Sequence, residues 1–112
     1  YAPEKIPYGI NRYTDEVNRL YGVLDKRLAG REYICDEYSI ADIISFPWVR
    51  RHENQGQNLA DFPDLEKWAA RMNARPALAR GVAAGAELRS ASYNLGQDKE
   101  AQKILFGQRA RS

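Results

Sequence analysis

Residues 38–43 read Tyr38-Ser39-Ile40-Ala41-Asp42-Ile43. A serine followed three residues later by an acidic residue, at the edge of an apolar run, is typical of a helix start. We expect the Ser39 hydroxyl to accept the backbone N–H of Asp42, and the Asp42 carboxylate to accept the N–H of Ser39. This reciprocal capping box accounts for both polar residues, so we interpret Ser39 and Asp42 as structural.

The helix that starts here is expected to be central in the fold, because it is apolar on most of its faces. The residues concerned are Ile40, Ile43, Ile44, Pro47 and Trp48. Before it, a long amphipathic helix is predicted between Pro7 and Gly30. Its apolar residues recur every three or four positions and form one stripe: Tyr13, Val17, Leu20, Tyr21, Leu24 and Leu28.

Three more helices are predicted after the polar loop at residues 54–58. One starts near Pro63 and ends before Pro76, and the next starts at Pro76. Their apolar stripes are Leu65, Trp68, Ala69 and Met72 in the first, and Leu78, Val82 and Ala86 in the second. A short helix is predicted at 99–106 with Asp98 as its cap. No segment shows a convincing strand pattern, so the predicted fold class is all-α, a helical bundle.

The composition excludes several classes of protein. The chain has 112 residues, the size of one domain. Its apolar runs are far shorter than the roughly 18 residues that span a bilayer. With one cysteine, Cys35, and one histidine, His52, it can form neither an internal disulfide nor a Cys/His zinc cluster. We therefore expect no metal site, no membrane insertion and a cytoplasmic setting.

The charge distribution argues against nucleic-acid binding. The formal net charge is +2, and the Lys and Arg residues of the mildly basic segment 75–112 are spread over nearly the whole of it. Nucleic-acid binding calls for a denser basic patch with aromatic residues between the charges. A solvated basic face is the simpler interpretation.

The stretch Ser39-Ile40-Ala41-Asp42, followed by Phe62-Pro63, Trp68 and Arg75-Pro76-Ala77, resembles the C-terminal helical domain of cytosolic glutathione transferases. The segments 6–13 and 104–108 are similar to the bacterial nu-class members, which are glutathione-dependent disulfide-bond oxidoreductases. The resemblance implies a partial helical domain at residues 1–90, without the family's first helix, and a tail with a possible short helix at 91–112. It also implies that the thioredoxin-like N-terminal domain, which activates glutathione, lies outside this chain.

The same resemblance implies a glutathione site at the start of the long helix. Arg12 would pair with a carboxylate of the tripeptide, and Tyr8 and Asn11, within one turn of it, would donate hydrogen bonds to the same ligand. Tyr13 and Trp48 are candidates for an apolar pocket that takes the second substrate. The alternative for each residue is structural: a surface arginine, helix-start residues, or aromatic residues of the core.

No catalytic residue is expected in the chain. Asp36 and Glu37 disfavour a reactive thiolate at Cys35, and His52 is interpreted as an exposed residue at a helix end. The expected function is the helical half of a glutathione-dependent transferase or disulfide-bond oxidoreductase, which forms a pocket wall and a homodimer contact and is inactive alone. Glutathione would be the co-substrate, beside a small electrophile or disulfide. The alternative is a non-catalytic protein-interaction module of the same fold.

Overall fold

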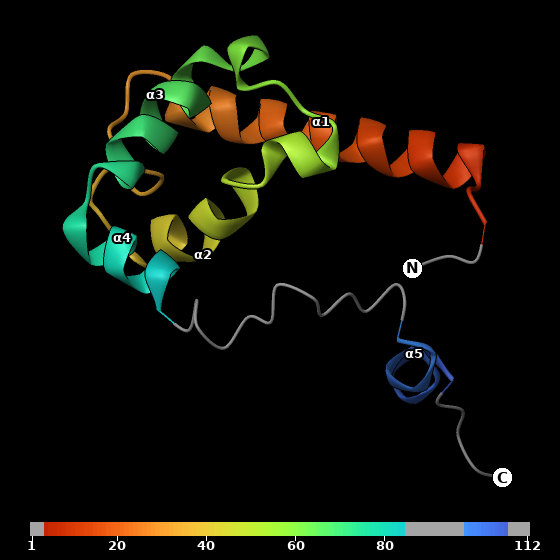
Figure 1. Ribbon diagram of the computed structural model, residues 1–112. Helices are drawn as coiled ribbons and strands as arrows, with labels where there is room; N and C mark the ends of the chain where they lie inside the picture. Colours follow the sequence, from red (N-terminus) through yellow and green to blue (C-terminus); the bar gives the residue numbers. More distant parts are fainter. Residues whose placement is uncertain (1–3, 85–97, 108–112) are drawn as a thin grey trace, which may run out of the picture. The chain divides into compact units, whose positions relative to one another are not determined.

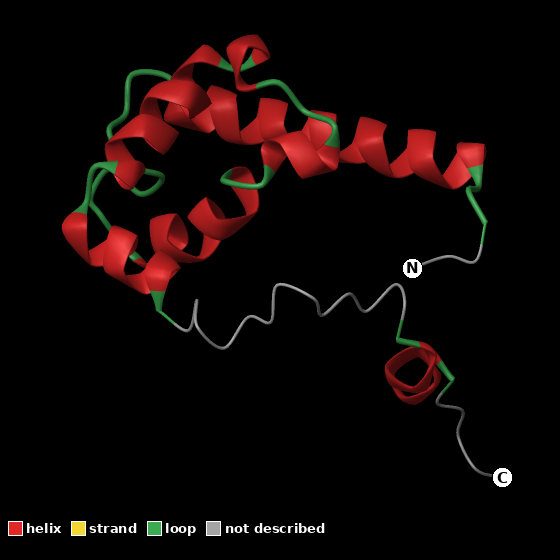
Figure 2. Cartoon of the chain, viewed as in Figure 1, coloured by secondary structure: helices red, strands yellow, loops and turns green. Residues whose placement is uncertain are grey.

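A computed structural model describes residues 4–84 and 98–107, and in these residues the regular structure is helical (Figures 1 and 2). The helices are α1 (Pro7–Leu28), α2 (Ile40–Val49), α3 (Pro63–Asn73), α4 (Pro76–Ala83) and α5 (Lys99–Phe106), with short 3-10 helices at His52–Gln55 and Leu59–Asp61. The chain divides into two compact units, one of residues 7–84 and one that contains α5. The all-α prediction is confirmed. The predicted boundary at residue 90, like Ala86, lies outside the described residues.

Local sequence signals set the ends of these helices. Pro7, Pro63 and Pro76 each begin a helix, where a missing N–H costs no hydrogen bond. Gly30, with φ of 72°, takes the left-handed conformation just after α1. In α5, treated on its own, the Asp98 carboxylate accepts the N–H of Ala101 at 2.9 Å, as predicted for a cap.

The start of α2 contains the predicted capping box, with both reciprocal interactions between Ser39 and Asp42. The Ser39 hydroxyl also accepts the N–H of Ala41 at 3.2 Å. Asp42 is fully buried, and its carboxylate does more than cap the helix. It accepts the N–H of Ser39 at 3.0 Å, the N–H of Ile34 at 3.1 Å and the indole N–H of Trp68 at 2.8 Å. One side chain therefore joins α2, the preceding loop and α3.

Replacing Ser39 with alanine is expected to lower the free energy of unfolding by about 1 kcal/mol, the usual cost of losing an N-cap side chain. Urea denaturation followed by circular dichroism measures this effect. Ser45→Ala is the matched control, because it makes the same change inside α2 without touching the cap. A Ser39→Ala midpoint equal to that of the unmodified chain would contradict the role of the hydroxyl.

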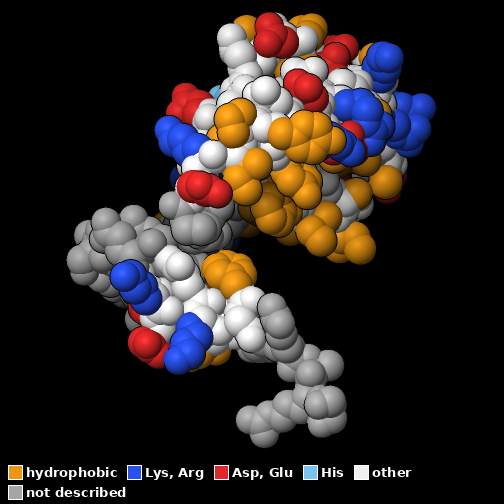
Figure 3. Space-filling view, turned by 90° about the vertical axis from the view of Figure 1, so that its right-hand side faces the viewer, with side chains coloured by type: hydrophobic (Ala, Val, Ile, Leu, Met, Phe, Trp, Pro, Cys, Tyr) orange, Lys and Arg blue, Asp and Glu red, His pale blue; other side chains and the backbone are white. Residues whose placement is uncertain are grey.

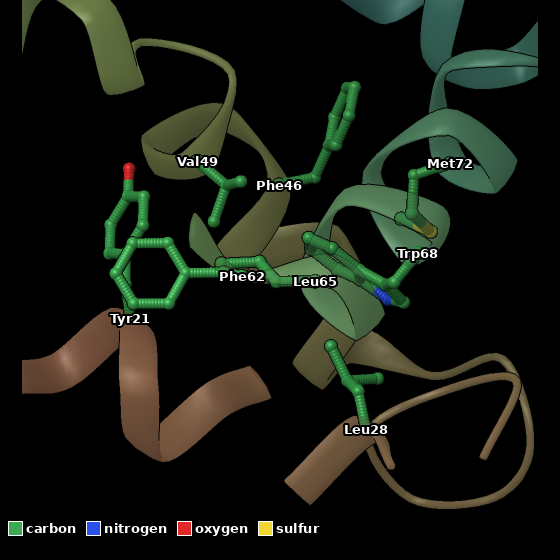
Figure 4. Close-up of a cluster of buried hydrophobic side chains, with 8 residues drawn as sticks. All are labelled: Tyr21, Leu28, Phe46, Val49, Phe62, Leu65, Trp68 and Met72. Carbon is green, nitrogen blue, oxygen red and sulfur yellow. The ribbon is translucent and has the colours of Figure 1, made fainter. Parts of the chain in front are cut away.

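The core of the larger unit lies between α1, α2 and α3. It is made of eight buried side chains, drawn in Figure 4: Tyr21, Leu28, Phe46, Val49, Phe62, Leu65, Trp68 and Met72. Edge-to-face ring contacts join Tyr21 to Phe62 and Phe46 to Trp68, with ring centroids 5.6 Å and 6.2 Å apart. Leu78 and Val82 of α4 pack against this cluster, as the predicted stripe requires.

The start of α3 is capped by a residue from another helix. Phe62, at the N-cap position, makes no side-chain cap. Instead, the carboxylate of Asp25 on α1 accepts the N–H groups of Asp64 and Leu65, each at 2.9 Å. One carboxylate oxygen of Asp25 therefore accepts two of the N–H groups that have no partner within the first turn of α3.

Two features of the predicted core are wrong. Tyr13 and Leu20 belong to the predicted stripe of α1 but are exposed. Tyr13 lies in the N-terminal half of α1, which extends beyond the other helices of its unit (Figure 1). The helix α2 is not buried on all sides: Ile40, Ile44 and Trp48 are exposed, since only its opposite face packs against α3.

Candidate functional site

The candidate glutathione-binding residues share one face of α1. Pro7 begins the helix, so Tyr8, Asn11 and Arg12 stand at positions spaced by three and four residues in its first two turns. All three are exposed, and the Arg12 side chain retains 56% of its accessible surface. The structure therefore brings these three residues together on an open surface that a charged ligand can reach.

Arg12 has only a weak charged partner. Its guanidinium lies 3.6 Å from the carboxylate of Glu16, one turn further along the helix. Glu16 is held more closely by Arg19, whose Nη2 and Nε atoms donate to its two carboxylate oxygens at 2.7 Å and 2.9 Å. The hydrogen bond from Arg19 is also the main reason why the pKa of Glu16 is lowered. Because Glu16 already has a good partner, Arg12 can exchange it for a ligand carboxylate at little cost.

The backbone of Trp48 is held in place by hydrogen bonds from two side chains. Its indole is exposed, but its carbonyl oxygen accepts the Tyr21 hydroxyl at 3.4 Å and the Gln55 amide at 3.2 Å. The Tyr21 hydroxyl also lies 2.7 Å from the side-chain amide oxygen of Gln55, and burial raises the pKa of Tyr21. These contacts anchor the C-terminal end of α2 against the middle of α1, so Trp48 has a defined position relative to the candidate site.

Tyr13 and Trp48 do not line a described pocket together. One shallow hollow of the larger unit has Leu28, Gly30, Arg31, Glu32, Asp64, Lys67 and Arg71 on its walls. Another is formed by Arg50, Arg51, Glu53 and Asn54. Neither hollow includes Tyr13 or Trp48. The proposed apolar pocket therefore stays a prediction, and it would need further protein atoms to enclose it.

Gln57 is a residue near the site that the sequence reasoning missed. It is buried, and its side-chain amide donates to the carbonyl oxygens of Thr14 at 3.0 Å and Gln55 at 3.2 Å. Its own carbonyl oxygen accepts the Asn18 amide at 3.0 Å. Gln57 thus connects the loop after α2 to Thr14 and Asn18 of α1, and Thr14 lies two residues beyond Arg12. It stands in a polar loop, where nothing in the sequence marks it as buried.

The remaining candidates lie apart from this surface. Ser39 and Asp42 are engaged in the capping box, which agrees with their structural interpretation. Cys35 is exposed in the loop before α2, and one ring nitrogen of His52 lies 3.1 Å from the carbonyl oxygen of Val49. In the described part of the chain, no three His, Cys, Asp or Glu side chains are grouped as metal ligands would be. Among the helices of residues 4–84 and 98–107, none is long and apolar enough to span a membrane.

Comparison with known proteins identifies relatives with named functions. The family model described as the glutathione S-transferase C-terminal domain matches residues 11–76, more than half of the chain. Two disulfide-bond oxidoreductases of Escherichia coli, YfcG and YghU, are 44% and 43% identical to it, each over 72% of the chain. A solved glutathione transferase from Burkholderia graminis, with two glutathione molecules bound per subunit, is 45% identical over 66% of the chain, with a TM-score of 0.60.

The matched region is only part of each relative. It covers 38% of the YfcG sequence, 31% of the YghU sequence and 33% of the solved transferase. The chain thus spans about a third of the length of the relatives it matches.

Proposed function

Since the chain belongs to the glutathione S-transferase C-terminal domain family and is related to disulfide-bond oxidoreductases, we propose that it is the helical half of a glutathione-dependent disulfide-bond oxidoreductase or transferase. In this role it forms one wall of the substrate site and part of a dimer contact. The other half, which activates the glutathione sulfur, would lie outside the described chain. A small disulfide or electrophile is the second substrate.

The observation that carries the proposal is the face of α1 formed by Tyr8, Asn11 and Arg12. Glutathione carries two carboxylates, and a planar guanidinium is the side chain best suited to pair with a carboxylate. Arg12 is exposed and its pairing with Glu16 is long, so its guanidinium is available to such a ligand. Tyr8 and Asn11 add hydrogen-bonding groups on the same face.

The chain's own contribution is to bind and orient. The sulfur that reacts belongs to glutathione, so the helical half needs no protein thiol, and the exposed Cys35 has no assigned role. Tyr13 and Trp48 supply aromatic surface for the second substrate, with Trp48 held in place through its carbonyl oxygen. We expect the chain alone to show only background turnover with glutathione and a mixed disulfide, because residues 4–84 and 98–107 show no group placed to activate the sulfur.

Replacing Arg12 with alanine in the full-length protein is expected to weaken glutathione binding by roughly ten- to a hundredfold. A charge-assisted hydrogen bond contributes about 1.5–3 kcal/mol, which corresponds to this change in affinity. Isothermal titration calorimetry with glutathione measures it directly.

Lys26→Ala is the matched control, because Lys26 is an exposed basic residue of the same helix but lies nearly four turns away from Arg12 and does not contact Glu16. Its affinity for glutathione should equal that of the unmodified protein. If Arg12→Ala also binds with unchanged affinity, Arg12 is an ordinary surface residue and the site must lie elsewhere. If both variants lose affinity equally, the effect comes from the charge of the helix and not from a specific contact.

A further inference from the structure

The two parts of the candidate site stand on different helices. Arg12 lies in the second turn of α1, and Trp48 lies near the C-terminal end of α2. Figure 3 views the larger unit from the side toward which α1 extends, and on this side hydrophobic side chains gather beside Lys and Arg side chains. A ligand with a charged part and an apolar part suits such a surface. It can contact both parts at once only if they are held at a fixed separation and orientation.

The segment Gln55–Gln57 joins the two helices. On the side of α1, its side chains bond to three residues that share one helix face because they are spaced by four and three positions: Thr14, Asn18 and Tyr21. On the side of α2, the Gln55 amide donates to the Trp48 carbonyl oxygen at 3.2 Å. The Gln57 amide also donates to the backbone carbonyl oxygen of Gln55 at 3.2 Å. A continuous series of hydrogen bonds therefore leads from α1 to the backbone of Trp48.

Gln57 makes the contact of this series that lies nearest to Arg12. Within residues 7–84, its bond to the Thr14 carbonyl oxygen is the most N-terminal hydrogen bond between α1 and another part of the unit. A helix rises about 1.5 Å per residue, so Thr14 is about 3 Å from Arg12 along the axis, whereas Tyr21 in the core is about 13.5 Å away. Gly56 brings the loop close to the same point: a Cβ at this position would lie 3.6 Å from Cγ2 of Thr14. Without Gln57, the position of Arg12 depends on contacts further along α1.

We propose that Gln57 is a positioning residue, which holds Arg12 in register with Trp48 so that one ligand contacts both. The ligand class that depends on this register is a glutathione S-conjugate, with a tripeptide carboxylate on Arg12 and an apolar substituent on the sulfur against Trp48. The inference rests on the proposed function, because it uses the binding roles given there to Arg12 and Trp48. It adds a role for a buried side chain that contacts no ligand itself.

Isothermal titration calorimetry of the full-length protein with glutathione and with S-benzylglutathione tests the proposal. The unmodified protein should bind the benzyl conjugate roughly tenfold more tightly, because the ring gains apolar contact. Gln57→Met keeps the length of the side chain and removes its hydrogen bonds. It should reduce this preference at least fivefold and leave the affinity for glutathione within twofold. A purely structural role would lower the binding stoichiometry for both ligands and leave the ratio of their affinities unchanged.

Two further variants make the test specific to the hydrogen-bond series. Gln55→Met breaks the series at its other end and should reduce the preference in the same way, which keeps the test open if Gln57→Met does not fold. Asn54→Ala is the control, because it removes an exposed amide from the same loop, and it should keep the full preference.

A double variant asks whether Gln57 acts through Trp48. Trp48→Ala should abolish the preference, and adding Gln57→Met should cause no further loss. If Gln57→Met and Gln55→Met retain the preference, or if the unmodified protein binds both ligands equally, the positioning role is overturned while glutathione binding stands. If the unmodified protein binds neither ligand, the proposed function itself fails, and the inference fails with it.

Discussion

Replacing Asp42 with alanine should lower the free energy of unfolding by about 3–5 kcal/mol, several times the effect of losing the Ser39 hydroxyl. The substitution leaves three donors without their acceptor: the buried indole N–H of Trp68 and the part-buried backbone N–H groups of Ile34 and Ser39. Each buried donor that loses its partner costs about 1–3 kcal/mol. Urea denaturation at neutral pH measures the loss.

Two variants give this experiment its controls. Asp15→Ala removes an exposed carboxylate on α1 and should change the unfolding midpoint little. Trp68→Phe removes one of the three donors while keeping an aromatic ring in the core. If the effects of Trp68→Phe and Asp42→Ala simply add in the double variant, the indole and the carboxylate are not coupled, and the central role assigned to Asp42 is wrong.

Replacing Asp25 with alanine is expected to cost about 2–4 kcal/mol of unfolding free energy. Its carboxylate accepts two backbone N–H groups at the start of α3, and hydrogen bonds to a charged acceptor contribute about 1.5–3 kcal/mol each. The expected loss is below the sum of the two, because Asp25 is only half-buried and water can reach the freed N–H groups. Because Phe62 offers no side-chain cap, no neighbouring side chain replaces the lost acceptor. Guanidinium denaturation followed by circular dichroism reports the change.

Asp25→Asn refines the interpretation, because it keeps one acceptor oxygen and removes the charge. An intermediate loss of stability is expected for this variant. If Asp25→Ala unfolds at the same denaturant concentration as the unmodified chain, then α3 finds other acceptors for its first turn, and the cap from α1 contributes nothing to stability.

The elements that the sequence predicted are those with local signals. Ser39 and Asp42 stand three residues apart, Pro63 and Pro76 stand at helix starts, and Asp98 stands directly before α5. Each signal acts within one helical turn, so it can be recognised without knowledge of the fold. The contact between Asp42 and Trp68 joins residues 26 positions apart, and nothing in either neighbourhood indicates it.

The candidate site shows the same contrast between features that local spacing predicts and features that depend on long-range contacts. The positions of Tyr8, Asn11 and Arg12 on one helix face follow from their spacing alone. The exposure of Tyr13 and Trp48 does not, because periodicity reveals that a helix has an apolar stripe but not what covers it. Gln57 was missed for a related reason: its burial depends on Thr14 and Asn18, about forty residues earlier in the chain.

The cap that Asp25 provides for α3 also links the folding of two helices. The acceptor and its donors are 39 and 40 residues apart, so the first turn of α3 gains these bonds only after α1 has docked. Local fraying of α3 is therefore suppressed while α1 stays in place. The amide hydrogens of Asp64 and Leu65 should exchange with solvent deuterium only when both helices open together, so these two amides report on cooperative opening of the larger unit.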